Sequence, residues 1–424
     1  MILAKVYQLF LASTGVCTDT RKIKEGQLFF ALKGDNFNGN KYAEQALNAG
    51  ASFAVVDEAV YALNNQYILV EDVLTCLQEL AAVHRRYLNI PIIAITGSNG
   101  KTTTKELLQV VLQQKYNTYA TKGNLNNHIG VPLSLLELTN EHELAIIEMG
   151  ANHQEEIASY CKWVKPNYGL ITNIGKAHME GFGGIAGIIK GKTELYQALE
   201  ENKGLVFYNA DDNILTEHSE KVLRKFSFAQ EAKAELNYSL SLVDSFISVK
   251  VNKVQIYSNM IGIYNGHNIA AAIAIGTFFK VPLTAMKIAI EGYHADNNRS
   301  QIVNYKGNQV ILDAYNANPT SMMAALENFL SLSSNKKGVF LGDMFEIGPT
   351  SSQEHSAIVN FLEDKKIDFC VLVGKAFFKH RNEQFLFFEN VQDAKQWFDL
   401  QNFSSHHLLI KGSRGMRMED LIKE

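Results

Sequence analysis

Residues 92–114 leave this chain few possible folds. A fully apolar run, IIAIT, ends in a glycine-rich turn, GSNG, and a helical pattern follows at once. In the helix predicted over 103–114, Leu107, Val110 and Val111 lie on one face. A buried strand that leads through a turn into a helix is typical of a parallel sheet covered by helices.

The turn itself predicts an anion site, because a helix that starts there points free backbone N–H groups and its positive end toward the turn. Gly97 and Gly100 permit close backbone approach, Lys101 can reach terminal phosphates, and the Thr102 hydroxyl can bind Mg²⁺. The spacing is a short G-x-x-G-K-T, since Ile95 stands where the longer phosphate loop has its first glycine. A plain glycine-rich turn with a surface lysine is disfavoured, because all the required residue types occur in order.

Strand and helix patterns alternate along the chain and divide it into three α/β units, as expected for 424 residues at roughly 150 per domain. We predict domains over 1–90, 91–297 and 298–424. The sequence NIP at 89–91 marks the first boundary, because the residue before a proline avoids the helical region, and the turn DNN at 296–298 marks the second. Predicted strands lie at 27–32, 52–56, 92–96, 144–149, 168–173, 205–208, 309–312, 338–341, 369–373 and 407–410, and helices at 42–49, 71–87, 103–114 and 269–279.

The composition excludes several classes of protein. Hydrophobic residues make up 46% and charged residues 20%, which is typical of a globular chain and not of a disordered one. Lys and Arg number 40 against 44 Asp and Glu, and the resulting net charge of −4 offers no general surface for nucleic acid. No apolar run approaches the roughly 20 residues that span a bilayer. The 4 cysteines form no CxxC pair. We therefore expect a soluble cytoplasmic protein that neither binds nucleic acid nor enters a membrane.

Three further side chains are candidates for chemistry near the phosphate turn. Glu148 closes the apolar strand AIIE, where a charge is costly unless it faces a cleft or a cation, so metal binding is favoured over a pairing with a local lysine. His178 follows another strand among glycines, and for it metal binding and an ordinary hydrogen-bonded role remain equally open. Lys192, in IIKGKTELY, has no role from spacing and is interpreted as a solvated helical lysine.

Segments along the whole chain resemble the Mur ligase family, the ATP-dependent amide-forming enzymes of peptidoglycan precursor synthesis. The segments are TDTRKIKEGQLFFALKG, ITGSNGKTTTKE, GNLNNHIGVPL, EMGANHQEEIA, AHMEGFGGIAGIIKGKTEL, NADDN, YNGHNIAAAIA, DAYNANPTSM, LGDMFEIG and KGSRGMRMEDL. The phosphate turn fits all Mur ligases and the folylpolyglutamate synthetases, whereas DAYNANPTSM, LGDMFEIG and KGSR resemble the branch that adds D-alanyl-D-alanine. The resemblance implies a small N-terminal α/β domain that binds UDP, a central P-loop ATPase-like domain with a parallel sheet, and a C-terminal Rossmann-like α/β domain.

The resemblance also implies an activity: a monomer that joins D-alanyl-D-alanine to UDP-N-acetylmuramoyl-tripeptide through an acyl phosphate, with ATP, two Mg²⁺ ions and a carbamylated lysine at Lys192. The catalytic residues that it implies are Lys101, His178, Lys192 and Arg299. The implied ATP contacts are Gly97, Ser98, Asn99, Gly100, Lys101, Thr102, Thr103, Asn268, Arg299, Asp313 and Tyr315. The implied Mg²⁺ ligands are Thr102, Glu148, His178 and Lys192. The implied substrate contacts are Asp19, Thr20, Arg21, Phe30, Lys33, Asn126, Asn127, Asn316, Asn318 and Ser321.

Two residues depart from the family pattern: Thr20 replaces the usual serine, and His128 stands where relatives often have an acid. Because Arg299 lies beyond the second boundary, the resemblance predicts that the C-terminal domain closes on the substrates. Three alternatives remain. A folylpolyglutamate synthetase is disfavoured, because about ninety residues with TDTRKIKEGQLFFALKG precede the phosphate turn. A sibling Mur ligase that adds a single amino acid, or a binding protein that ATP merely switches, would differ in what its ATP consumption requires.

Overall fold

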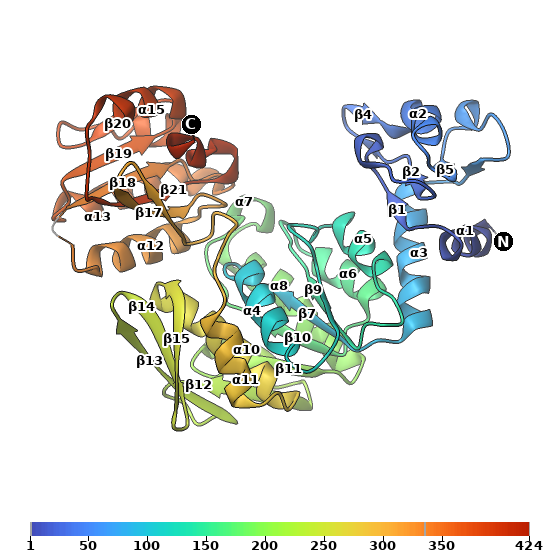
Figure 1. Ribbon diagram of the computed structural model, residues 1–424, viewed down its shortest axis with the longest axis horizontal. Helices are drawn as coiled ribbons and strands as arrows, with labels where there is room; N and C mark the ends of the chain where they lie inside the picture. The colour runs from blue at the N-terminus through green and yellow to red at the C-terminus, as the bar shows by residue number, and fades with distance from the viewer. Residues whose placement is uncertain (1, 335, 424) are drawn as a thin grey trace.

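The computed structural model describes residues 2–334 and 336–423. The chain forms a mixed α/β structure in which an N-terminal and a C-terminal lobe lie apart from each other, each against a central part (Figure 1). The three main sheets have four, nine and six strands, in that order along the chain. Among the described residues, no helix is long and apolar enough to cross a membrane.

The N-terminal lobe is built on a parallel sheet with the strand order β1-β2-β5-β6. Its elements are α1 (Ile2–Leu11), β1 (Val16–Cys17), β2 (Leu28–Phe30), the hairpin β3 (Lys33–Gly34) and β4 (Phe37–Asn38), α2 (Ala43–Asn48), β5 (Phe53–Val56), β6 (Tyr67–Leu69) and α3 (Val73–Leu88). The predicted strands at 27–32 and 52–56 and helices at 42–49 and 71–87 are confirmed with shifted ends. Helix α3 is capped by Asn89, which takes the left-handed conformation with φ 51°, as expected just before the Ile90–Pro91 break.

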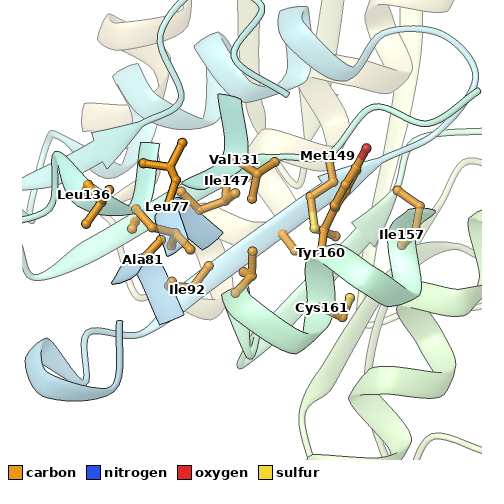
Figure 2. Close-up of a cluster of buried hydrophobic side chains, with 14 of the residues drawn as sticks. Leu77, Ala81, Ile92, Val131, Leu136, Ile147, Met149, Ile157, Tyr160 and Cys161 are labelled. Carbon is orange, nitrogen blue, oxygen red and sulfur yellow. The ribbon is translucent and has the colours of Figure 1, made fainter. Parts of the chain in front are cut away.

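Helix α3 packs on the central part of the chain as well as on the N-terminal lobe. Figure 2 shows Leu77 and Ala81 from α3 in one apolar cluster with Ile92 and Ile147 of the central sheet. On the polar side, Arg85 Nε donates to the carbonyl of Val164 at 2.9 Å. Because one core runs through both parts, the first predicted boundary follows a helix that is rigidly attached to what comes next.

The central sheet has the order β15-β14-β13-β12-β11-β10-β7-β9-β8 and is parallel from β8 to β13. Its strands are β7 (Ile92–Thr96), β8 (Thr118–Ala120), β9 (Leu144–Glu148), β10 (Tyr168–Ile171), β11 (Leu205–Asn209), β12 (Arg224–Ala229), β13 (Leu236–Val243), β14 (Phe246–Val251) and β15 (Val254–Ile261). The predicted strands at 92–96, 144–149, 168–173 and 205–208 are confirmed as β7, β9, β10 and β11. The antiparallel extension β13–β14–β15 was not predicted.

Helices cover both faces of this central sheet. They are α4 (Lys101–Leu112), α5 (Gly130–Leu136), α6 (Glu156–Val164), α7 (Met179–Phe182), α8 (Ile185–Glu201), α9 (Asn213–Ser219), α10 (Ile263–Phe278) and α11 (Leu283–Glu291). The alanine-rich helix α10 is buried along most of its length and packs against α4. This packing fixes the helix that starts at the phosphate turn.

The C-terminal sheet has the order β16-β17-β21-β18-β19-β20, parallel except for β16, which pairs antiparallel with β17. Its elements are β16 (Gln301–Tyr305), β17 (Asn308–Asp313), α12 (Pro319–Ser331), β18 (Lys337–Gly342), α13 (Ser351–Glu363), β19 (Phe369–Val373), α14 (Lys375–Phe378), β20 (Leu386–Phe388), α15 (Val391–Leu400) and β21 (His407–Lys411). The predicted strands at 309–312, 338–341, 369–373 and 407–410 correspond to β17, β18, β19 and β21. In the segment that enters this lobe, Asn298 and Ser300 have left-handed φ angles of 57° and 51° on either side of Arg299.

Candidate active site

A cavity of about 740 Å³ lies where the phosphate turn faces the C-terminal lobe. Residues predicted from sequence that line it are Ser98, Asn99, Gly100, Lys101, Thr102, Thr103, Asn126, Asn127, Glu148, His178, Asn268, Arg299, Asp313, Tyr315, Asn316, Asn318 and Ser321. Gly97 and Lys192 are predicted site residues outside this lining. The cavity therefore brings together predicted residues from the central part and from the C-terminal lobe, which are far apart in the sequence.

The phosphate turn requires its glycines. Gly97 has φ 141°, and a Cβ there would lie 2.0 Å from Thr172 Oγ1. Gly100 has φ 78°, and a Cβ there would lie 2.5 Å from Asn268 Oδ1. Both positions thus combine a backbone conformation that favours glycine with no space for a side chain. Asn268 itself accepts a hydrogen bond from Thr104 Oγ1 at 3.1 Å, so its side chain is fixed where it packs against Gly100.

Lys101 folds across its own turn, where Nζ donates to the carbonyl of Gly97 at 2.7 Å and to that of Ser98 at 3.2 Å. Burial lowers the pKa of Lys101 to about 8; Glu148 opposes this shift, and the positive charge of Arg299 reinforces it. An anion bound in the turn would favour the protonated form and offer Nζ a stronger acceptor than two carbonyls.

Glu148, at the end of β9, is fully buried and faces the start of α4. Its Oε1 accepts hydrogen bonds from Thr102 Oγ1 at 3.1 Å and from Asn126 Nδ2 at 2.7 Å. Its Oε2 lies 3.6 Å from Lys105 Nζ and has no hydrogen-bond partner among the residues that the structure describes. A buried carboxylate oxygen without a hydrogen bond is costly, and beside a threonine hydroxyl it suits a hard divalent cation. The pairing with a local lysine that was considered for Glu148 is therefore observed, and its partner is Lys105, one helical turn after Thr102, while the metal role of Glu148 stays a prediction.

Two neighbouring contacts tie the turn to the C-terminal lobe and to the end of β10. Thr172 Oγ1 donates to the carbonyl of Asn99 at 2.6 Å. Asn318 Nδ2 donates to Asn99 Oδ1 at 2.8 Å, and Asn318 also caps helix α12 by accepting from the Ser321 N–H at 2.9 Å. The N-terminus of α12 is thereby held against the phosphate turn. Asn316 also lines the cavity, next to this cap.

The loop after β10 contacts the C-terminal lobe through charged side chains. His178 Nδ1 is paired with the carboxylate of Glu346, and Lys176 Nζ lies 2.7 Å from Glu354 Oε1. The His178 hydrogen bond also lowers the pKa of Glu346. The hydrogen-bonded role considered for His178 is therefore observed, while its metal role stays a prediction.

Lys192 corrects the interpretation from spacing, since it is not a solvated helical lysine. Its relative exposure is 1%, its Nζ donates to the carbonyl of Ala151 at 3.1 Å, and it lies 5.0 Å from the centroid of the Phe182 ring. Burial, reinforced by the charge of Lys101, lowers the pKa of Lys192 well below its ordinary value, although Glu156 and Glu194 oppose this. The amine is therefore held in an environment that favours its neutral form.

Arg299 and Tyr315 form a stacked pair in the wall of the cavity, with Arg299 Cζ 3.6 Å from the ring centroid. Nearby, the carboxylate of Asp313 accepts from the Ser300 N–H at 3.2 Å and from Lys411 Nζ at 2.6 Å. Lys411 was not predicted. Its position follows from the strand register, in which Asp313 and Lys411 are partners on β17 and β21.

The predicted uridine-site residues lie in the N-terminal lobe, away from this cavity. A second cavity of about 1170 Å³, between that lobe and the central part, includes Asp19 but not Thr20, Arg21, Phe30 or Lys33. Arg21 forms two hydrogen bonds of 2.9 Å with Asp19, which lower the pKa of that carboxyl to about 2. The Phe30 side chain is fully buried in the core, so a substrate contact by this side chain is corrected to a packing role.

Three family models match the chain one after another. "Mur ligase family, catalytic domain" matches residues 13–85, "Mur ligase middle domain" matches 95–276, and "Mur ligase, glutamate ligase domain" matches 298–414. The chain is 34% identical over 423 residues to the UDP-N-acetylmuramoyl-tripeptide–D-alanyl-D-alanine ligase of Bacillus subtilis, and the match covers 97% of this chain and 92% of the relative. The chain belongs to the Mur ligase family.

Other relatives of this Mur ligase agree. The ligase of the same name from Escherichia coli is 35% identical over 369 residues, covering 85% of this chain and 81% of the relative. The crystal structure of MurF from Acinetobacter baumannii superposes with a TM-score of 0.86 at 31% identity, covering 98% of this chain and 96% of that one. A MurF ligase from Thermotoga maritima, crystallised in complex with ADP, shares the fold with a TM-score of 0.86 at 23% identity. In this Mur ligase the 740 Å³ cavity is lined from the middle and the glutamate ligase domains.

Proposed function

We propose that this Mur ligase joins D-alanyl-D-alanine to UDP-N-acetylmuramoyl-tripeptide, converting ATP to ADP and phosphate and forming the UDP-linked pentapeptide. The observation that carries the proposal is the shared cavity, which is lined by the Lys101 turn from the central part and by Arg299 from the C-terminal lobe. The names of relatives with at least 30% identity over most of their length support the choice of substrates.

The first step activates the acid. A carboxylate oxygen of the tripeptide attacks the γ-phosphorus of ATP, the bond from that phosphorus to the bridging oxygen breaks, and ADP leaves with the electron pair. The product is an acyl phosphate, which is reactive toward an amine where the free carboxylate is not. Negative charge builds on the transferring group, so Lys101 and Arg299 would contribute most if they contacted it in the transition state.

The second step forms the amide. The amino nitrogen of D-alanyl-D-alanine attacks the acyl carbon, and the tetrahedral anion collapses with loss of phosphate and of the proton from nitrogen. The side chains of Asn316, Asn318 and Ser321 line the same cavity and are proposed to face the dipeptide or the reacting carbon. Because Asn318 is hydrogen-bonded to Asn99, the part of the cavity proposed to bind the amine is held at a fixed position relative to the phosphate turn.

We propose that Thr102 and Glu148 hold one Mg²⁺ ion and that His178 contributes to a second. The buried Glu148 Oε2 without a hydrogen-bond partner among the described residues supports the first assignment. When bound, Mg²⁺ would supply charge neutralisation at the phosphates. On this assignment Lys105, 3.6 Å from the same oxygen, offsets the charge of Glu148 while the cation is absent.

We propose that Lys192 reacts with CO₂, so that the amine nitrogen bonds the carbon and one proton is released. The product is an anionic carbamate in place of the neutral amine. The lowered pKa of Lys192 supports this proposal, because only the neutral amine reacts. Ala151, whose carbonyl accepts from Lys192, lines the cavity.

We propose that the N-terminal lobe binds the UDP end of the substrate through Asp19, Thr20, Arg21 and Lys33, and that Asn126 and Asn127 meet its sugar peptide. Asn127 is already fixed by its own loop, because its Oδ1 accepts from the Gly130 N–H at 2.8 Å. We further propose that the enzyme acts as a monomer in the cytoplasm, where both nucleotide substrates would be available to it.

The test is a coupled phosphate-release assay in which each of the three substrates is omitted in turn. We expect release only when ATP, the UDP-linked tripeptide and D-alanyl-D-alanine are all present, and hydroxylamine should trap the acyl phosphate during turnover. Phosphate release without any carboxylate substrate would overturn the mechanism. Replacement of the dipeptide by single amino acids without loss of rate would instead indicate a sibling ligase.

A further inference from the structure

We infer that Lys411, the last residue of β21, is a positioning residue for Arg299, an assignment that rests on the proposed function of Arg299. Lys411 has a relative exposure of 1%, and its Nζ is within hydrogen-bond distance of two oxygen atoms. Each oxygen belongs to a segment that contacts or adjoins Arg299. A buried lysine is costly unless it is paired, so these two partners determine where its charge lies.

The first segment reaches the backbone next to Arg299. Lys411 Nζ donates to Asp313 Oδ2 at 2.6 Å, and Asp313 Oδ1 accepts from the N–H of Ser300 at 3.2 Å. Ser300 is the residue after Arg299 and has a left-handed φ of 51°. The Asp313 carboxylate therefore fixes an unfavourable backbone conformation directly beside the arginine, and Lys411 fixes the carboxylate.

The second segment reaches the side chain. Lys411 Nζ also donates to the carbonyl of Asn316 at 3.1 Å. The preceding residue, Tyr315, presents the ring on which the Arg299 guanidinium stacks at 3.6 Å. One ammonium group thus holds the backbone on one side of Arg299 and the aromatic surface on the other.

Arg299 depends on these neighbours, because its buried Nε has no hydrogen-bond partner among the described residues. Stacking on a ring fixes the plane of a guanidinium but lets the group slide parallel to the ring. The position of the Arg299 guanidinium in the cavity is therefore set by the Arg299 backbone and by the position of the Tyr315 ring. A second support comes from Tyr264, whose hydroxyl lies 2.8 Å from Ser300 Oγ. Tyr264 belongs to the middle domain, whereas Lys411 acts within the same lobe as Arg299.

The test compares Lys411→Met with Lys337→Met in the purified full-length enzyme. Lys337 is a matched control, since it lies on the neighbouring strand β18, has 7% exposure and donates to the carbonyl of Leu330 at 2.6 Å. We measure kcat, the KM for ATP, the affinity for ADP and the melting temperature. A misplacement of about 1 Å in a catalytic group can cost about 100-fold, so kcat should fall by about tenfold or more in Lys411→Met.

A double-mutant cycle with Arg299→Ala separates positioning from a merely structural role. In the Arg299→Ala background, Lys411→Met should cost less than about twofold in kcat, because its target is already absent. If Lys411→Met also changes the affinity for ADP by displacing Asp313, that change should be the same in the wild-type and the Arg299→Ala enzyme. An equal loss of kcat in both backgrounds, or an unchanged kcat in Lys411→Met, would overturn the inference.

If Lys411→Met does not fold, Lys411→Arg replaces it in the same cycle, because it keeps the charge while its larger planar guanidinium displaces the donor nitrogens from the position of Nζ. A kcat loss that disappears in the Arg299→Ala background supports the inference, and any other result overturns it. The proposed function fails separately: wild-type enzyme would then release no phosphate with all three substrates, before any variant is compared.

Discussion

The substitution Gly100→Ala tests whether the phosphate turn is the nucleotide site. At φ 78° an L residue costs about 1–2 kcal/mol relative to glycine. The new Cβ would also lie 2.5 Å from Asn268 Oδ1. Asn268 cannot simply move away, since it accepts from Thr104 Oγ1 at 3.1 Å and donates to Asn265 Oδ1 at 3.0 Å. Overpacking of this kind typically costs about 1–3 kcal/mol, so the total is about 2–5 kcal/mol.

The free protein can relieve the steric part of this strain by moving the turn, but a bound nucleotide needs the native turn. The cost is then transferred to binding, where 2 kcal/mol corresponds to about 30-fold in affinity. Gly307→Ala is a matched control, because Gly307 has φ 76° in the β16–β17 turn and its Cβ would lie 3.4 Å from Ser404 Oγ, an ordinary contact.

Titration with a fluorescent ADP analogue, followed by calorimetric unfolding, measures both effects. We expect both variants to be destabilised by their backbone conformation, and only Gly100→Ala to lose about 30-fold or more in nucleotide affinity. A Gly100→Ala variant that binds nucleotide within about twofold of wild type would refute the steric argument and the placement of the phosphates.

Three further predictions concern charged groups. Lys192→Ala should lower kcat by at least about tenfold, and a short carboxylic acid should restore part of it, as rate assays with and without bicarbonate would show; full activity of the untreated variant would contradict the carbamate. Glu148→Gln should weaken metal binding by at least about tenfold, measured by Mn²⁺ resonance spectra with ADP present, and unchanged binding would exclude Glu148 as a ligand. The pKa of Lys101 falls from an unfolded value of 10.5 to about 8, so the unfolded chain binds more protons between these values and the stability of the free protein should rise across that window. Lys101→Met should lose this rise. Melting temperatures that depend on pH in the same way for the wild type and for Lys101→Met between pH 7 and pH 10.5 would contradict the prediction.

The sequence was sufficient where the pattern is local. The strand at 92–96 is buried on every residue and is followed directly by the helix, so β7 and its turn could be placed without knowledge of the rest. The extension β13–β15 was missed because it lies at one edge of a sheet, where an apolar run gives way to partial exposure along the strands.

The buried lysines could not be predicted, because their burial depends on tertiary contacts. Lys192 has the surroundings of an exposed helical residue in sequence, yet Ala151 and Phe182 cover it. Lys411 acquires its partner only through the pairing of β21 with β17, two strands that are almost a hundred residues apart. Phe30 shows the opposite error, since a motif-based role was assigned to a side chain that the N-terminal sheet buries completely.

The way α3 is built into the central core limits how this enzyme could be re-engineered. Chimaeras that exchange residues 1–90 with a sibling, in order to graft a different nucleotide-sugar preference, would also exchange the face on which α5 and α6 rest. In such hybrids the foreign α3 would not match the side chains of α5 and α6 on which it packs. A splice just ahead of Val73 leaves that face native and transplants the N-terminal sheet together with its loops, α1 and α2.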